Sequence, residues 1–227
     1  MAQKEKTVVY CSGPLFCPEE IGGMTAIAGV LEQNGYATFL PHRDGLEAHV
    51  MKFLNSPLGI NILKSRQVVD RLIFALDLFQ IIERCGCIVV NTNGRVPDEG
   101  AVAEAAMAFM AGKPVVLYKN DCRSVFRGRD NSMVTGLATG PVVNRLDDIP
   151  GAVKKTCASD KGPTDGTRPL PLNVAQTVAL GKKVWRLMGF LHADGGPAKE
   201  AQGLAAEISA FCLDWQDNPM EQKTGEP

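Results

Sequence analysis

Residues 87–118, CIVVNTNGRVPDEGAVAEAAMAFMAGKPVVLY, have the pattern of a strand, a helix and a second strand. The first strand, CIVVN at 87–91, is short and mostly apolar, which is typical of a strand in the middle of a parallel sheet. The helix is predicted at 101–111 and the second strand at 114–118. A strand that leads through a helix to a further strand favours a parallel α/β sheet with helices on both faces.

Glu104 is the only polar residue of the eleven in the predicted helix 101–111, AVAEAAMAFMA. A helix that is apolar on all sides is expected to be buried, and a buried carboxylate must be paired, neutral or functional. The partial positive charge of the helix N-terminus favours an ionised Glu104, which suits a nucleophile or a general base. The alternative interpretation is that Glu104 caps its own helix or reaches solvent at the helix edge. Structural networks also perturb carboxylates, so both interpretations stay open on this feature alone.

The alternation of strands and helices extends over the first two thirds of the chain. Strands are predicted at 6–12 and 36–40, helices at 21–34 and 65–84, and a last short strand at 141–144. After residue 147 comes a turn-rich segment at 158–171, then two helices at 174–191 and 199–215 and a polar, disordered tail at 217–227. We expect one α/β domain over residues 1–150 and a loop and helical extension over 151–227.

The composition is that of an ordinary globular protein. A net charge of −1 and a charged fraction of 22% over 227 residues do not suggest a nucleic acid or a membrane surface as partner. The seven cysteines contain no C-x-x-C pair and the three histidines are scattered, so neither a metal site nor a disulfide framework is predicted. No apolar run approaches the roughly 20 residues of a membrane helix, and the polar start MAQKEK is unlike a signal peptide. A cytoplasmic protein with free thiols is expected.

Polar segments follow three of the predicted strands, at residues 12–16, 91–100 and 119–133. In open parallel sheets, ligands bind at the carboxyl ends of the strands, so these segments are expected to converge on one edge. None of them is a G-x-G-x-x-G or a P-loop, which argues against a dinucleotide or triphosphate site. We expect a site for a small molecule and no cofactor.

Four motifs in these segments make the chain similar to a known family. They are YCSGPLF at 10–16, DL at 77–78, PDEGAVAE at 97–104 and NSM at 131–133. Over residues 7–143 the chain resembles the nucleoside 2-deoxyribosyltransferases, and the P-D-x-G-x-x-x-E element is the most specific part of the resemblance. It implies a flavodoxin-like three-layer α/β fold, a homodimer or higher homo-oligomer, and transfer of 2-deoxyribose between nucleobases in nucleotide salvage.

The resemblance also implies roles for individual residues. Glu104 matches the catalytic nucleophile, Asp98 the acid/base group beside the nucleobase, and Asp77 a second carboxylate at the base site. Asn131 matches a residue that a neighbouring subunit contributes near the sugar hydroxyl. The implied substrate-binding residues are Tyr10, Gly13, Pro14, Phe16, Asn131 and Met133.

Cleavage of an N-glycosidic bond fits this set of carboxylates. An anionic carboxylate below C1′ stabilises the oxocarbenium-like state and captures it, and two displacements retain the sugar configuration. A second carboxylate must carry a proton to and from the base, with a pKa above that of the nucleophile. Structural interpretations stand beside these roles: Asp98 and Asn131 as ordinary helix caps, and Asp77 on a solvated helix face.

Two other functions stay open. One is hydrolysis of nucleosides or nucleoside 5′-monophosphates, for which Ser12, Arg129 and Ser132 are the candidate phosphate ligands. Asp98 would repel a 5′-phosphate, so a nucleoside is favoured. The other is a nucleotide-sensing module without catalysis, because a fold does not determine a function. His42 is predicted to lie in a loop, and Trp185 and Trp215 to be packing or interface anchors.

Overall fold

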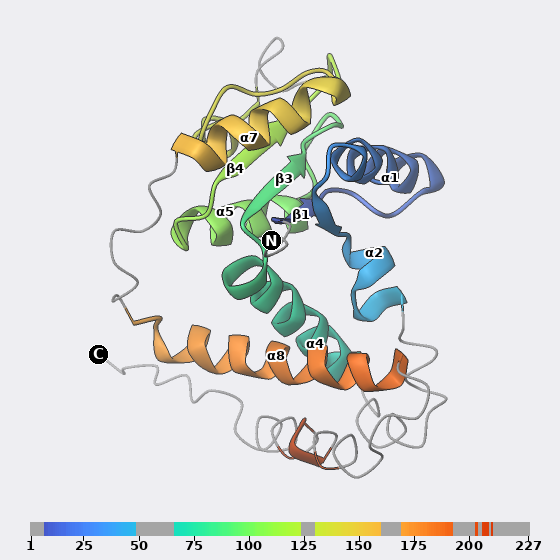
Figure 1. The fold of residues 1–227 in the computed structure, drawn as a ribbon, viewed down its shortest axis with the longest axis vertical. Helices are drawn as coiled ribbons and strands as arrows, with labels where there is room; N and C mark the ends of the chain where they lie inside the picture. The colour runs from blue at the N-terminus through green and yellow to red at the C-terminus, as the bar shows by residue number, and fades with distance from the viewer. Residues whose placement is uncertain are drawn as a thin grey trace, which may run out of the picture.

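The computed structural model describes residues 7–48, 66–123, 130–159 and 169–192, together with residues 203, 206–208 and 210. Its centre is a parallel sheet with the strand order β2-β1-β3-β4 (Figure 1). The strands are β1 (Val8–Ser12), β2 (Ala37–Phe39), β3 (Cys87–Asn91) and β4 (Val115–Tyr118). The predicted parallel α/β sheet is confirmed, and this strand order is that of flavodoxin-like folds.

The short strand predicted at 141–144 is reduced to one bridge between Tyr118 and Val143. Val143 donates its backbone N–H to Leu117 and accepts from Lys119, so it extends the sheet beyond β4 by a single parallel pair. Pro141 has no N–H to donate, which shortens the ladder before Val143. The prediction of a strand was therefore wrong.

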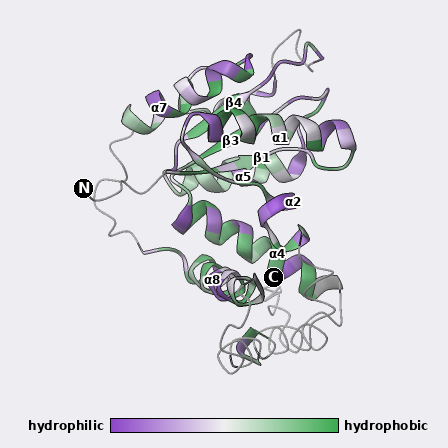
Figure 2. Cartoon of the chain, turned by 45° about the vertical axis from the view of Figure 1, so that its right-hand side comes forward, coloured by the Kyte–Doolittle hydropathy of each residue, from purple (hydrophilic) through white to green (hydrophobic). Residues whose placement is uncertain are grey.

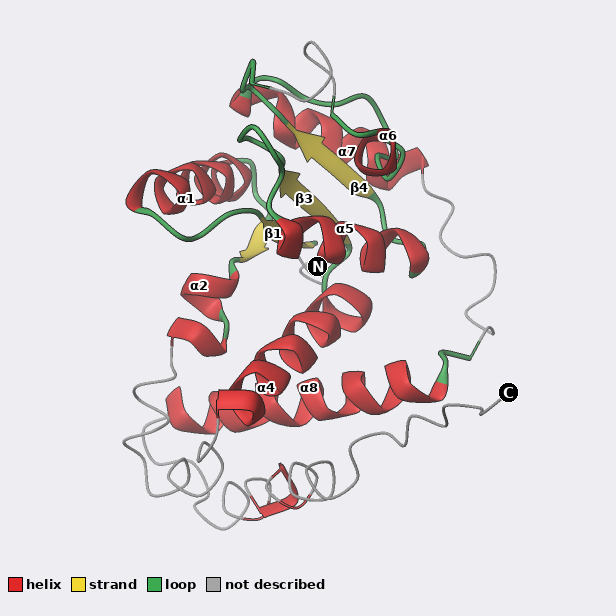
Figure 3. Ribbon diagram, turned by 180° about the vertical axis from the view of Figure 1, so that it is seen from behind, coloured by secondary structure: helices red, strands yellow, loops and turns green. Residues whose placement is uncertain are grey.

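Helices cover both faces of the sheet and form three layers. One face carries α1 (Pro18–Gln33) and α7 (Ile149–Ser159), and the other carries α5 (Glu99–Met110) (Figure 3). Side chains alternate between the faces along each strand, so Val9 and Cys11 face α1 while Tyr10 faces α5. The same alternation places Ser12 on the α5 side, next to Tyr10.

A helical pair lies beyond α5. Helix α4 (Arg66–Phe79) continues into a π-helical turn, η1 (Gln80–Arg84), and packs against α8 (Leu172–His192). In Figures 1 and 3, α4 lies between α8 and the sheet. Figure 2 shows hydrophobic residues on both helices, and these form a cluster of their own.

Several local predictions need correction. Helix α7 was not predicted, because Pro150 and Gly151 resemble a turn, although proline is tolerated in the first turn of a helix. His42 lies in a short helix, α2 (Pro41–Asp44), and not in a loop. The short helix α6 (Ser132–Thr135) agrees with the interpretation of Asn131 as a helix cap, whereas the 3₁₀ turn η2 (Leu146–Asp148) was not predicted.

The apolar sequence of α5 predicted a helix that is buried on all sides. This prediction was wrong, because one part of the helix is exposed. Its inner face is lined by Ala101, Ala105 and Ala108, whereas Phe109 and Met110 are 50% and 82% exposed. Alanine lines the sheet because small side chains let the helix lie close to the strands. The exposed end of α5 is an apolar surface of the single chain.

The remaining predictions concern the last third of the chain. Helix α8 confirms the helix predicted at 174–191. Most of the segment 158–171 and most of the predicted helix 199–215, with Trp215, lie outside the described residues, as does the whole tail 217–227. Among the residues that are described, no helix has the length and apolar character needed to cross a membrane.

The crossing of α8 over α4 depends on Gly181. A Cβ atom at this position would overlap the carbonyl oxygen of Ala75 and lie 2.7 Å from Cβ of Phe79. We predict that Gly181→Ala lowers the free energy of unfolding by roughly 1–3 kcal/mol, because the helices must move apart. The matched control is Gly189→Ala on the same helix, where a Cβ meets nothing within 4 Å. It should stabilise the protein by up to about 1 kcal/mol through helix propensity. Urea unfolding of both variants checks this, and equal effects would contradict it.

Candidate active site

Glu104 lies on the side of α5 that faces β1. The Tyr10 hydroxyl donates to Oε1 of Glu104 at 2.7 Å, and the Ser12 hydroxyl donates to Oε2 at 2.5 Å. Both oxygens of a half-buried carboxyl are thus held by side chains from one strand. Glu104 therefore neither caps its own helix nor projects freely into solvent, but is paired with two hydroxyls.

The surroundings of Glu104 raise its pKa to about 7. Burial is the largest cause, and the negative charges of Asp98 and Glu47 act in the same direction. The hydrogen bonds from Ser12 and Tyr10 lower the pKa but do not offset the burial. We expect the helix N-terminus to favour the ionised form, and a pKa of about 7 leaves that form present at neutral pH.

Asp77 lies in the last turn of α4, and its carboxyl interacts with Glu104 and Tyr10. Its pKa is raised well above the usual range. Burial is the largest cause, the charges of Glu104 and Glu47 act in the same direction, and the hydrogen bond with the Tyr10 hydroxyl lowers the pKa. Its Oδ1 atom is buried and accepts no hydrogen bond from any described residue. A solvated face position is therefore wrong for Asp77, which is half-buried beside the Glu104 carboxyl.

Sequence reasoning missed Glu47. Its carboxyl raises the pKa of Tyr10, Asp77 and Glu104, so it belongs to the same cluster although the residue itself is exposed. The only signal in the sequence is its place a few residues after β2, on the edge where polar segments converge. The Tyr10 hydroxyl, whose own pKa is raised by burial and by Asp77 and Glu104, lies at the centre of this cluster.

Asp98 caps the N-terminus of α5, as the structural interpretation proposed. Its Oδ2 atom accepts the backbone N–H of Ala101 at 2.8 Å. Asp98 is half-buried, and its charge raises the pKa of Glu104. The cap therefore holds Asp98 beside the nucleophile candidate, and the structural and functional interpretations are compatible.

The turn after β1 supports the predicted pocket wall only in part. A Cβ on Gly13 would lie 2.5 Å from Sδ of Met24 and 2.8 Å from Cβ of Asn91, so only glycine fits this close approach to β3. Pro14 is buried. Phe16, however, is 85% exposed.

Asn131 and Met133 lie apart from the carboxyl cluster. Asn131 caps α6 by accepting the N–H of Met133 at 2.9 Å, and Met133 is 80% exposed. Within the described part of the single chain, no hydrogen bond joins Asn131 to Glu104, Asp98 or Asp77. Of the candidate phosphate ligands, Ser12 is engaged by Glu104, Ser132 is exposed, and Arg129 lies outside the described residues.

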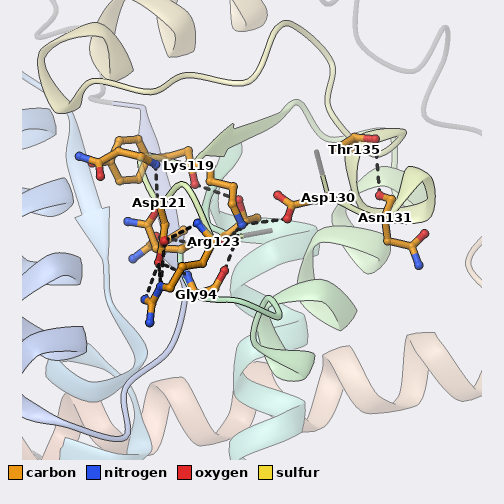
Figure 4. Close-up of polar contacts among 12 residues, drawn as sticks. Gly94, Lys119, Asp121, Arg123, Asp130, Asn131 and Thr135 are labelled. Carbon is orange, nitrogen blue, oxygen red and sulfur yellow. Dashed lines mark hydrogen bonds and ion pairs between the residues drawn. The ribbon is translucent and has the colours of Figure 1, made fainter. Parts of the chain in front are cut away.

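A buried ion pair connects the two loops at this edge (Figure 4). Nζ of Lys119, directly after β4, donates to Oδ1 of Asp130 at 2.8 Å and to the carbonyl oxygens of Thr92 at 2.9 Å and Gly94 at 3.2 Å. The side chains of Lys119 and Asp130 are only 8% and 5% exposed. Lys119 thereby joins the loop that leads to Asp98 with the residue that precedes Asn131. Sequence reasoning did not assign it a role.

Asp121 makes a second link between these loops. Its Oδ2 accepts the backbone N–H of Gly94 at 3.0 Å and pairs with Arg123 at 2.5 Å. Hydrogen bonds from Arg123 hold the pKa of the Asp121 carboxyl well below its usual range. Polar groups after β3 and β4 do converge on one edge, as the sequence predicted.

The sequence profile of the family described as nucleoside 2-deoxyribosyltransferase matches residues 9–189 of the chain. The chain belongs to this family. The match extends beyond the motifs at 7–143 and includes α7 and most of α8, so the deoxyribosyltransferase profile covers helices that had no assignment.

The chain is also similar, at low sequence identity, to proteins of solved structure. A conserved protein from Enterococcus faecalis V583 has 19% identity and a TM-score of 0.49, covering 66% of this chain and 99% of its own. A 2-deoxyribosyltransferase from Bacillus psychrosaccharolyticus has 19% identity and a TM-score of 0.46, covering 63% and 90%. No curated protein sequence matches the chain.

The raised pKa of Glu104 predicts a pH-dependent effect of Glu104→Gln. A carboxyl whose pKa rises from 4.5 unfolded to about 7 folded costs stability as the pH increases between these values. Removing its charge should therefore stabilise the protein by roughly 1–3 kcal/mol above pH 7 and leave the stability unchanged near pH 4. Thermal unfolding at pH 4, 6 and 8 checks this, with Glu99→Gln at the exposed start of the same helix as control. A gain that is the same at each pH would contradict it.

Proposed function

We propose that the protein transfers 2-deoxyribose between nucleobases and that Glu104 is the nucleophile. The observation that carries this proposal is the Glu104 carboxyl itself, held at both oxygens by the Tyr10 and Ser12 hydroxyls with further carboxyls around it. Membership of the nucleoside 2-deoxyribosyltransferase family supports the reaction class.

In the first half-reaction, an oxygen of Glu104 forms a bond to C1′ of the sugar while the bond from C1′ to the base nitrogen breaks. The departing base takes up a proton, for which Asp98 is our candidate acid/base group. In the second half-reaction, the nitrogen of an incoming base displaces Glu104 from C1′ and loses a proton. Two inversions at C1′ retain the configuration of the nucleoside.

The environment of each carboxyl suits a different task. Glu104 has a pKa near 7, so its reactive ionised form is present at neutral pH, and the rate should rise as the pH increases through this value. Burial raises the pKa of Asp77 well above the usual range, which favours its protonated form, the form that donates a hydrogen bond to the base. Separate protonation states for neighbouring carboxyls are what acid–base chemistry on a leaving base requires.

The charge of the cluster favours a nucleoside over a nucleoside monophosphate. Four carboxyls, those of Glu47, Asp77, Asp98 and Glu104, act on one another here. A dianionic phosphate placed among them would be repelled, and Ser12 is already committed to Glu104. The substrates we infer are a neutral deoxynucleoside and a free nucleobase, with no metal or cofactor in the reaction.

Exposed residues support an oligomer that completes the site. Asn131 caps an exposed short helix, and Met133 is 80% exposed beside it. Phe16 is 85% exposed on the turn after β1. We propose that Asn131 and Met133 face the sugar in the site of a neighbouring subunit, and that Phe16 packs in that same interface.

The test is base exchange. The protein is incubated with deoxyinosine or thymidine, with and without adenine, and the bases and nucleosides are separated by chromatography. We expect a new deoxynucleoside that forms only when adenine is present. Glu104→Ala should reduce its formation by at least about 10³-fold, whereas Glu99→Ala on the same helix should retain it.

Other outcomes decide against the proposal. Release of free base without a new nucleoside means hydrolysis. Turnover of a monophosphate in preference to its nucleoside contradicts the substrate class. If neither nucleosides nor monophosphates are turned over, the chain is a binding module and not a transferase.

A further inference from the structure

Helix α8 lies outside the sequence motifs, yet an aromatic column connects it to the carboxyl cluster. The Trp185 ring packs edge-on against Phe39, with centroids 6.1 Å apart and an interplanar angle of 68°. Phe39 in turn stacks on Tyr10 at 5.4 Å and 30°. Tyr10 is completely buried, and its hydroxyl is the donor to Glu104.

Trp185 is held on both sides. The guanidinium of Arg84 lies over the indole, 4.3 Å from the ring centroid, and is itself bonded to Gln80 at 3.0 Å. Trp185 also contacts two apolar clusters, the one between α4 and α8 and the one between the sheet and α5. It is therefore one side chain through which α8 contacts the layer that contains the site.

A second contact of α8 is made with α4, the helix that carries Asp77. Gly181 lets the backbone of α8 close on the carbonyl of Ala75 in α4. Asp77 follows Ala75 by two residues, which is a rotation of about 200° around the helix, so the two lie on opposite sides of α4. The crossing at Gly181 therefore supports α4 on the side opposite to Asp77.

We propose that α8 is a positioning element of the active site, with Trp185 as the positioning residue that orients the Tyr10 hydroxyl through Phe39. The geometric part of this inference is independent of the reaction, and its effect on turnover rests on the proposed function. Trp185 reaches the site through Phe39 and Tyr10.

The consequence is measurable at Glu104. The hydrogen bond from Tyr10 lowers the pKa of Glu104, and a Tyr10 ring that tilts would donate less well, so this pKa would rise. The other groups that act on Glu104 are Ser12, Asp98, Glu47 and Asp77. Ring contacts through Phe39 and the hydrogen bond from Tyr10 connect Trp185 to Glu104, so a shift of the Glu104 pKa that Trp185→Leu and Phe39→Leu share reports on Tyr10.

The experiment measures the pKa of Glu104 in the unliganded protein by carbon-13 NMR of labelled glutamate carboxyls, with the signal assigned through Glu104→Gln. Trp185→Leu should raise this pKa by about 0.5 or more, and Trp185→Phe, which keeps an aromatic ring against Phe39, should retain it. Phe39→Leu interrupts the same column from the sheet and should act like Trp185→Leu. If Trp185→Leu does not fold, the Glu104 pKa in Phe39→Leu tests the proposal instead.

The matched control is Leu187→Ala, two residues further along α8, which is buried only in the cluster between α4 and α8. It should lower the unfolding temperature without moving the Glu104 pKa. If Leu187→Ala shifts the pKa as much as Trp185→Leu, or if neither Trp185→Leu nor Phe39→Leu shifts it, the proposal is wrong.

Kinetics separates this proposal from the proposed function. If the wild type exchanges bases, Trp185→Leu should lower kcat about tenfold and move the acidic limb of the pH profile to higher pH, while Leu187→Ala leaves both within about twofold. If the wild type exchanges no bases, the proposed function fails, but the NMR titration still decides whether α8 positions Tyr10.

Discussion

The candidate active site depends on one constraint, which is the partial burial of the Glu104 carboxyl against the hydroxyls of two β1 residues. Alternation along the strand directs Tyr10 and Ser12 to the same face of the sheet. The cap at Asp98 starts α5 where its second turn brings Glu104 to these hydroxyls. The alanines of α5 allow the helix to lie close to the strands, so that both hydrogen bonds form.

Such a cluster opposes folding, and the rest of the fold holds it in place. Carboxyls that raise one another's pKa destabilise the chain in their ionised form, which is common at functional sites. The Lys119–Asp130 ion pair fixes the loop before Asp98 from one side. Helices α4 and α8 close the opposite side, where Asp77 and Tyr10 meet. Stability from these outer contacts offsets the cost of the site.

Local patterns in the sequence predicted β1, β3, β4, α5 and α8, and they singled out Glu104 as the one carboxylate of an apolar helix. They were sufficient because strand alternation and helix caps depend on near neighbours. Glu47 was missed and Lys119 was given no role because their partners are distant in sequence, as Lys119 shows by bridging two loops. Trp185 was predicted as a packing anchor, but its partner Phe39 was not, for the same reason. The raised pKa of Glu104 was not predicted, since its main cause is burial, which no local pattern measures.

The central claim is that Glu104 carries the sugar during the reaction, and mass spectrometry of the acid-quenched enzyme tests it most directly. The protein is mixed with a deoxynucleoside in the absence of an acceptor base, quenched within milliseconds and digested. The account predicts one added deoxyribosyl group on the peptide that contains Glu104, removed again when adenine is supplied before the quench. Base exchange without this adduct, or an adduct on another residue, would contradict the account.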